Sequence, residues 1–483
     1  MCLEYVSGKR RNSEGFMEAT EKKPWWKGIT QPFVDLARAP RALWGINFIT
    51  FFEGMVYFGF LGYLAMHFSD FIFQGVEGAD VHSHFMVMIL TAGITIMMFF
   101  LGGTADKWGA RKTIITALVF LIIGRVIISA APTLMGLKPA GLWSSLHIVT
   151  MLGILVISVG YGMFQPASYA GVKHYTTKKT SAMSYAMLYA VMNLGGFVPA
   201  LAFLLRDDDY MGLGITGTYW VYTSVTLVAL LGFYLILRKK VETRALEDAE
   251  LARKADGEKE EVEEKKNPFQ FSWRNVWVWI KNHPLANPKF AFFVFSLMPV
   301  RTLFVYNWLV MPQYINRSYT GFIGENFEVA SNINPILIFI LTPIITAFTL
   351  KKNVYTMMIL GTAVMAAPAF LLGFGTSPAL LFSYIIMMTI GEAMWSARFL
   401  QYAAEIAPKG QTGAYMGVAQ FPWFLTKVLA PLYTGYLMTQ YCPKEGTTSP
   451  ETMWIYFGLI AIISPILLLV FRFWAGKDFK TAA

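Results

Sequence analysis

Charged side chains are scarce in this chain. Only 14% of its 483 residues are Asp, Glu, Lys or Arg, whereas 55% are hydrophobic. A soluble domain cannot bury so much apolar surface, so the composition excludes an ordinary soluble protein and indicates one solvated by lipid. The formal net charge of +10 is explained by basic loops that face anionic lipid, and we expect no nucleic-acid partner.

Residues that bind metals or act as nucleophiles are also few. Cys2 and Cys442 fall on opposite predicted sides of the membrane, so we expect no disulfide between them. His82 and His84 form a short pair without a third ligand nearby. No acyl-transfer, phosphoryl-transfer or phosphate-loop motif is present, so we expect no metal, no cofactor and no enzyme activity. The N-terminus lacks the pattern of a cleaved signal peptide.

Long apolar runs dominate the rest of the chain, and a helix that crosses a bilayer needs about 20 such residues. Runs of this kind lie at about 42–67, 84–105, 113–131, 147–171, 182–205, 217–238, 289–315, 329–349, 354–374, 378–404, 412–438 and 452–475. The sequence therefore predicts an all-α integral membrane protein of about 12 transmembrane helices in two six-helix halves.

The spacing of these runs and the loop charges predict the order of segments. They are a cytoplasmic segment with an interfacial helix (1–41), an N-terminal half (42–238), a cytoplasmic linker with a second interfacial helix (239–288), a C-terminal half (289–475) and a cytoplasmic tail (476–483). Lys and Arg gather in alternate loops, and such loops face the cytoplasm. We therefore expect a multi-pass cell-membrane protein with both termini cytoplasmic. The charged part of the linker, 241–266, is predicted to be solvated, and a helix is one form open to it.

The loop after the second run contains a spaced set of Gly, Asp and basic residues. Its fixed positions are Gly102, Asp106, Lys107, Gly109, Arg111 and Lys112. The plainest interpretation is an ordinary basic turn. The spacing, however, resembles the signature loop of major facilitator superfamily (MFS) transporters, Gly-x-x-x-Asp-(Arg/Lys)-x-Gly-x-(Arg/Lys)-(Arg/Lys). This resemblance implies the MFS fold, alternating access between two halves, and a loop that acts as a conformational latch.

A few charges interrupt the apolar runs, and charges inside a membrane are costly and usually functional. Glu53, Arg301, Glu392 and Lys427 fall near the middle of their runs. Arg125, Arg398 and Glu405 lie nearer the ends, where snorkelling or loop pairing is an equally good explanation.

The short sequences that precede the first and the seventh apolar runs are similar, and this similarity gives a specific hypothesis about two of these charges. Aligning Pro40 with Pro288 places Glu53 on Arg301. We expect the two to face one cavity and to form an ion pair in one state of the transport cycle. A carboxylate buried without a partner favours its neutral form. Glu53 and Glu392 are therefore the predicted proton-coupling residues.

Several stretches resemble the proton-dependent oligopeptide transporter family. They are 331–343 with its Asn-Pro…Pro pattern, 188–196 with Asn-x-Gly, the Gly391-Glu392 pair, and the spacing of Trp308 and Gln313. The resemblance implies proton-coupled symport of small peptides or similar zwitterionic solutes. The predicted substrate-binding residues are Tyr57, Gln165, Tyr189, Asn193, Arg301, Asn334, Glu392, Trp395, Trp423 and Lys427. For the aromatic residues among them, ordinary helix packing is an equally good explanation.

The chain also departs from that family. Its first run lacks the family's first Glu and its Arg, and Gln165 stands before Pro166 where the family usually has Lys. Arg301 and Lys427 are candidates to supply the missing positive charge. An alternative function is export or carriage of another small solute. In either case the expected partners are a small-molecule substrate, protons and the lipid bilayer, with the protein working as a monomer.

Overall fold

A computed structural model describes residues 40–176, 178–255, 283–349, 352–405, 418–419 and 421–476. These residues form helices joined by turns, and none of them lies in a strand. The predicted interfacial helices, before residue 40 and at 269–281, lie outside the described residues.

The N-terminal helices begin with one long helix that ends in a wider turn. They are α2 (Arg41–Met66) with its π-helical continuation η1 (His67–Ile72), α3 (Ala79–Leu101), α4 (Thr104–Trp108), α5 (Ala110–Thr133), α6 (Ser145–Tyr175), α7 (Lys178–Phe197), η2 (Val198–Leu201), α8 (Phe203–Arg206) and α9 (Gly214–Ile236). The predicted tight signature turn is thus wrong in detail, because 104–108 forms the short helix α4.

The C-terminal helices are more broken. They are η3 (Pro284–Ala286), α12 (Pro288–Ser296), α13 (Met298–Leu309), α14 (Met311–Ser318), α15 (Gly321–Glu325), α16 (Phe327–Ser331), α17 (Ile333–Thr349), α18 (Val354–Ala366), η4 (Ala367–Gly373), α19 (Pro378–Glu405), α21 (Phe421–Tyr441), α22 (Pro450–Val470) and α23 (Arg472–Ala475). The run predicted at 289–315 is divided because Pro299 and Pro312 stand in the first turns of α13 and α14, where proline cannot continue a preceding helix.

Within the described residues, ten helices are long and apolar enough to cross a membrane. The other two predicted spans fall short for different reasons. The eighth is divided at Asn332, between α16 and α17. The eleventh, α21, has sufficient length but carries Lys427 and several Thr, Tyr and Pro residues.

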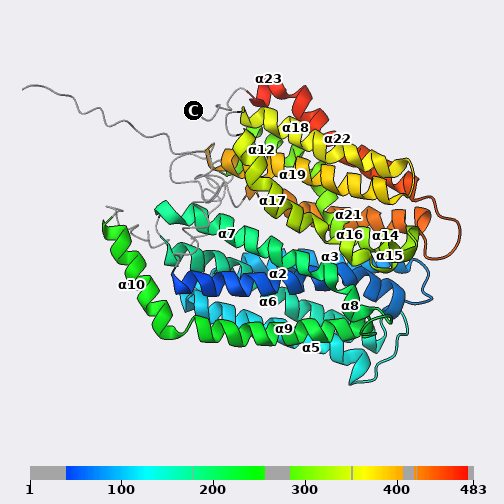
Figure 1. Ribbon diagram of the computed structural model, residues 1–483, viewed down its shortest axis with the longest axis horizontal. Coiled ribbons are helices and arrows are strands. Elements are labelled where there is room, and N and C mark those ends of the chain that lie inside the picture. Colours follow the sequence, from blue (N-terminus) through cyan, green and yellow to red (C-terminus); the bar gives the residue numbers. More distant parts are fainter. Residues whose placement is uncertain are drawn as a thin grey trace, which may run out of the picture. The chain divides into compact units, whose positions relative to one another are not determined.

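The N-terminal helices pack mainly on one another, as do the C-terminal helices (Figure 1). Helix α2 packs against α7 and α9, and α5 against α6 and α9. In the C-terminal group, α19 packs against α17 and α18, and α13 against α21 and α22. The two groups meet where α3 packs against α21 and α7 against α17.

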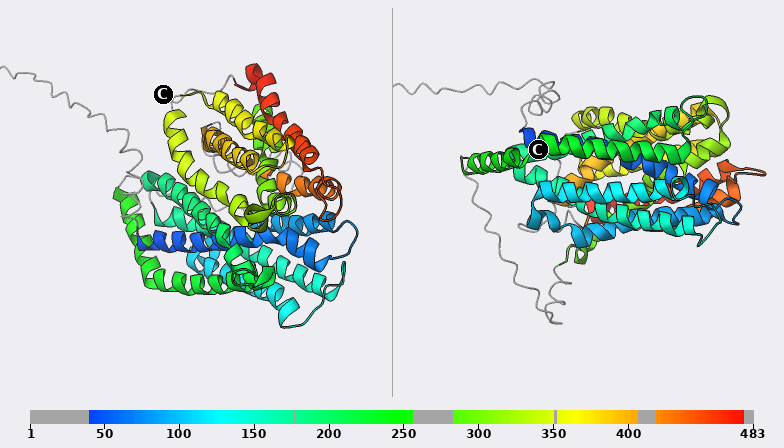
Figure 2. Two further views of the ribbon diagram at one scale, coloured as in Figure 1. Left: turned by 45° about the vertical axis from the view of Figure 1, so that its right-hand side comes forward. Right: turned by 90° about the horizontal axis from the view of Figure 1, so that it is seen from below.

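The first part of the predicted linker is helical. Helix α10 (Lys239–Ala255) leaves the end of α9 and turns across the ends of α2 and α6 (Figure 2). Ala245 and Ala249 are buried on its inner face, and the Tyr175 hydroxyl donates to Glu242 Oε1 at 3.3 Å. Much of its remaining surface is exposed and charged, as the sequence predicted for a solvated segment.

Glycine allows the closest helix contacts. A Cβ on Gly54 of α2 would lie 2.6 Å from the Met192 carbonyl oxygen of α7. A Cβ on Gly435 of α21 would lie 2.7 Å from Val81 Cα of α3, where the two groups of helices meet. Backbone atoms cannot move aside as a flexible side chain can, so these contacts require glycine.

Gly54→Ala should therefore destabilise the protein by about 1–3 kcal/mol, because the added methyl group overlaps the Met192 carbonyl. Gly62→Ala is the matched control in the same helix, since nothing lies within 4 Å of its Cβ position. Thermal unfolding in detergent should show a lower midpoint for Gly54→Ala than for Gly62→Ala. Equal midpoints would contradict the α2–α7 packing.

Candidate functional site

Glu392 is held by neighbours from two packed helices of the C-terminal group. It is 5% exposed, on α19. The Asn334 side-chain nitrogen, on α17, donates to Glu392 Oε2 at 2.9 Å and to Thr389 Oγ1 at 2.9 Å. None of the described residues forms an ion pair with Glu392. Within the described part of the chain, its carboxylate therefore has an amide partner but no matching positive charge.

Arg301, on α13, is a buried cation with no anion beside it among the described residues. It is 6% exposed, and its guanidinium carbon lies 4.4 Å from the Phe399 ring centroid and 5.5 Å from that of Trp395. Its Nη1 is buried and has no hydrogen-bond partner among the described residues. Ring faces stabilise a cation, but they do not replace the hydrogen bonds that a guanidinium makes in water. The arrangement favours an anionic ligand.

Lys427, on α21, is half-buried, with Nζ 5.3 Å from the centroid of the Trp423 ring. Phe304 connects this ring to Trp395, with centroid distances of 5.6 Å to Trp423 and 6.1 Å to Trp395. The Trp395 indole N–H also donates to Met365 Sδ at 3.1 Å, which fixes the ring. An aromatic row therefore joins the surroundings of Arg301 and Lys427.

The predicted substrate-binding residues on the N-terminal helices are uncharged. Tyr57 is half-buried and packs edge-on against Tyr161 at 5.0 Å, and Gln165 is also half-buried. Asn193 is buried and donates to the Tyr189 carbonyl at 2.8 Å, whereas the Tyr189 side chain is exposed. Both lie on α7, which packs against α17, and the Tyr189 hydroxyl is within electrostatic reach of Glu392. Tyr189 and Asn193 therefore approach the C-terminal site from the other group of helices.

Glu53 forms its ion pair with Arg125 in this structure. Arg125 of α5 donates to both of its carboxylate oxygens, from Nη1 at 3.1 Å and from Nη2 at 2.8 Å. The Tyr161 hydroxyl donates to Glu53 Oε2 at 3.1 Å, and Thr226 accepts from Arg125. Glu53 and Arg125 are each 1% exposed. The structure therefore shows no Glu53–Arg301 pair, and the snorkelling explanation of Arg125 is wrong.

Helix packing explains why the sequence did not reveal this pair. A Cβ on Gly124 would lie 2.7 Å from the Gly153 carbonyl oxygen of α6. At this close contact between α5 and α6, the neighbouring Arg125 is buried among the N-terminal helices rather than exposed at the membrane surface. The charge of Glu53 is matched, and Glu392 is the proton-coupling candidate that has no cation among the described residues.

The residues of the predicted latch stay near the N-terminal helices. Gly109 has φ +82°, which favours glycine, and it precedes α5. Arg111 Nε donates to the Leu237 carbonyl at the end of α9 at 2.5 Å, and its guanidinium lies over the Tyr234 ring. Gly102 is half-buried, whereas Lys107 and Lys112 are exposed. The side chain of Asp106 lies outside the described residues, and the latch remains a prediction.

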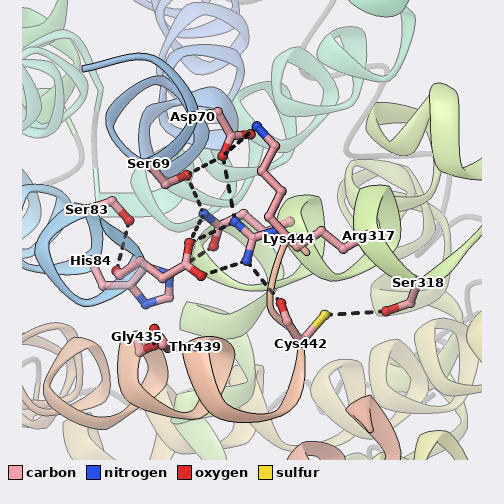
Figure 3. Close-up of polar contacts among 12 residues, drawn as sticks. Ser69, Asp70, Ser83, His84, Arg317, Ser318, Gly435, Thr439, Cys442 and Lys444 are labelled. Carbon is pink, nitrogen blue, oxygen red and sulfur yellow. Dashed lines mark hydrogen bonds and ion pairs between the residues drawn. The ribbon is translucent and has the colours of Figure 1, made fainter. Parts of the chain in front are cut away.

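A polar cluster joins α3, α14 and α21 near η1 (Figure 3). Arg317 donates to both carboxylate oxygens of Asp80, at 2.7 and 2.8 Å. The two ring nitrogens of His84 lie 2.8 Å from Thr434 Oγ1 and 3.0 Å from Gln313 Oε1. We call these five residues the α3–α14–α21 cluster. It ties N-terminal helix α3 to two C-terminal helices.

A second set of hydrogen bonds joins the N-terminal to the C-terminal helices. Arg206 Nε of α8 and the Tyr63 hydroxyl of α2 both donate to Glu328 Oε1 of α16, each at 2.6 Å. From the sequence, Gln313 was noted for its spacing from Trp308 and His84 for its pairing with His82, whereas Asp80 was not singled out. An Asp and a His four residues apart at the start of an apolar run were the available signal.

A hollow of about 540 Å³ lies elsewhere, between α2 and α9. Its lining is mostly apolar and includes Phe52, Trp220 and Val225. It contains none of the predicted site residues, so we assign it no role in substrate binding.

Within the described residues, ten helices are long and apolar enough to cross a membrane, and they pack in two groups, which is the architecture of a multi-pass membrane carrier. The family model for the Major Facilitator Superfamily matches residues 43–431, and the chain belongs to this family. Dipeptide and tripeptide permease B of Yersinia enterocolitica is 23% identical, with 93% of this chain and 97% of the permease covered. The permease of the same name from Photorhabdus asymbiotica is 23% identical, with 90% and 95% covered.

Solved structures share the fold at low identity. Peptide transporter POT in complex with sulfate matches with TM-score 0.66 and 15% identity, covering 91% of this chain and 96% of that one. A POT family transporter in complex with 5-aminolevulinic acid matches with TM-score 0.64 and 16% identity, covering 91% and 97%. A point mutant of the nucleoside transporter NupG matches with TM-score 0.64 and 14% identity, covering 89% and 99%. The fold thus accommodates different substrates and does not select one.

Two arginine variants separate structural from ligand-binding charges. Arg125→Gln should cost about 3–5 kcal/mol of stability, because it leaves Glu53 buried without a cation. Arg301→Gln should cost none, because it removes a buried charge that has no anion among the described residues. Thermal unfolding of both purified variants measures the difference. A larger loss for Arg301→Gln than for Arg125→Gln would contradict these assignments.

Proposed function

We propose that this protein imports small peptides or similar zwitterionic solutes together with protons, by alternating access. The observation that carries the proposal is the set of charges without ion-pair partners among the described C-terminal residues: Arg301, Glu392 and Lys427. A peptide brings an amine for Glu392 and a carboxylate for a cation, so its binding matches charges that are costly to leave unmatched. The permeases and POT structures to which the chain is similar support this substrate class.

Proton coupling is best assigned to Glu392. Protonating Glu53 would leave Arg125 as an unmatched buried cation, so the closed pair opposes it in this conformation. Among the described residues, Glu392 is bound by the Asn334 amide alone and can exchange a proton without breaking an ion pair. A proton and a substrate amine would then compete for, or successively occupy, the same carboxylate.

Alternating access requires a seal that can open on each side in turn. We assign one seal to the α3–α14–α21 cluster and the neighbouring Arg206–Glu328 pair, since both join the N-terminal to the C-terminal helices. Gly435 lets α3 and α21 approach closely there. With both termini cytoplasmic, as loop charge predicts, this seal is on the outer face of the membrane.

Peptide uptake in proteoliposomes tests the function. An inward proton gradient should drive accumulation of labelled dialanine. In Glu392→Gln, accumulation should fall to the level without a gradient while exchange of labelled for unlabelled peptide continues, because Gln keeps the hydrogen bond from Asn334 but cannot carry the proton. Glu247→Gln, at an exposed position of α10, is the matched control. Full gradient-driven accumulation by Glu392→Gln would contradict the proton role, and no peptide uptake by the wild type would favour another solute.

The buried thiol of Cys442 reports on the seal, because Arg317 Nη1 donates to its backbone carbonyl at 3.0 Å. In a Cys2→Ser background, Arg317→Gln should increase labelling of Cys442 by a membrane-impermeant maleimide several-fold, since Asp80 loses its cation. Lys444→Gln is the control, because it removes only an exposed contact of 3.8 Å to Asp70. Unchanged labelling of Arg317→Gln would exclude this cluster as a seal.

A further inference from the structure

The unpaired charges at the C-terminal site are unequal in number. Arg301 and Lys427 are cations and Glu392 is an anion, and among the described residues none of the three forms an ion pair. The site therefore carries one surplus positive charge when Glu392 is ionised. By contrast, Glu53 and Arg125 balance each other within the N-terminal helices.

A simple zwitterion cannot match this site. Its amine pairs with Glu392 and its single carboxylate with one cation, so the second cation stays unmatched in a medium where that is costly. A second acidic group on the substrate would match it. If Glu392 carries a proton, the site has two cations and no anion, and a second acidic group is favoured still more.

The two cations lie at different places along the aromatic row. This arrangement suggests that each cation binds a separate acidic group, rather than both binding one carboxylate. Arg301 lies over Phe399 and Trp395, whereas Lys427 lies over Trp423. Phe304 stands between the two tryptophan rings. Phe304 and Trp423 are half-buried, so their faces would pack against the apolar part of a substrate whose acidic groups lie at its two ends.

Resting on the proposed function, we infer that the transporter selects short peptides that carry an acidic side chain. The peptide's terminal carboxylate and its Asp or Glu side chain bind the two cations, and its amine faces Glu392. Lys427, which is half-buried, is the specificity-determining residue for the second acidic group, because the more deeply buried Arg301 requires an anion from any substrate.

Competition for uptake of labelled dialanine by wild-type protein in proteoliposomes tests this inference. The competitors are Ala-Glu and Ala-Gln, which have nearly the same shape and differ in charge, together with Ala-Lys. Ala-Glu should inhibit at a concentration ~10-fold lower than Ala-Gln, as expected for one charged hydrogen bond, and Ala-Lys should be the weakest. Lys427→Gln should bring the Ala-Glu to Ala-Gln ratio close to 1, and Lys427→Arg should restore it.

The ratio is independent of how much active protein each preparation contains. Equal inhibition by Ala-Glu and Ala-Gln in the wild type would overturn the inference while leaving peptide transport intact. A preference for Ala-Glu that survives in Lys427→Gln would overturn the role of Lys427. Absence of any dialanine uptake, with no inhibition to measure, would overturn the proposed function and this inference together.

Discussion

The cost of an unmatched charge in hydrocarbon is the constraint on which this structure depends. A buried ion must find a counter-ion, a hydrogen-bonding partner or a ligand. The N-terminal helices meet this demand internally, because Arg125 holds Glu53 through two hydrogen bonds. The C-terminal helices do not, because the described residues give Arg301 ring faces and no anion. The two groups of helices thus have different electrostatic roles.

This contrast supports a carrier in which charge recognition is confined to one group of helices. The N-terminal helices offer neutral groups, such as Tyr57 and Asn193, and a rigid internal ion pair. The C-terminal helices offer the charges that a substrate would match. The α3–α14–α21 cluster joins the two groups of helices, and the opening that we propose for it would exchange the Asp80–Arg317 ion pair for water without disturbing the central charges.

The sequence predicted the features that depend on length and composition. Apolar runs located the helices, and the spaced glycines and basic residues located the loop that contains α4. Arg301 and Glu392 were singled out as candidates because charges are rare among apolar residues, and the structure places both in buried positions. The partner of Glu53 was not predictable in this way, because the approach of α5 and α6 at Gly124 decides where Arg125 points. The α3–α14–α21 cluster depends on contacts between residues more than 200 positions apart in the sequence, such as Asp80 and Arg317. Local sequence patterns do not reveal such contacts.

The central claim is that the charges without internal partners bind the substrate and the internally paired charges do not. A structure determined with a bound acidic dipeptide tests it most directly. Our account places one carboxylate of the ligand within hydrogen-bond distance of Arg301 and its amine beside Glu392, with the Glu53–Arg125 pair still closed. A ligand bound to Arg125, with Glu53 displaced and Arg301 untouched, would contradict it.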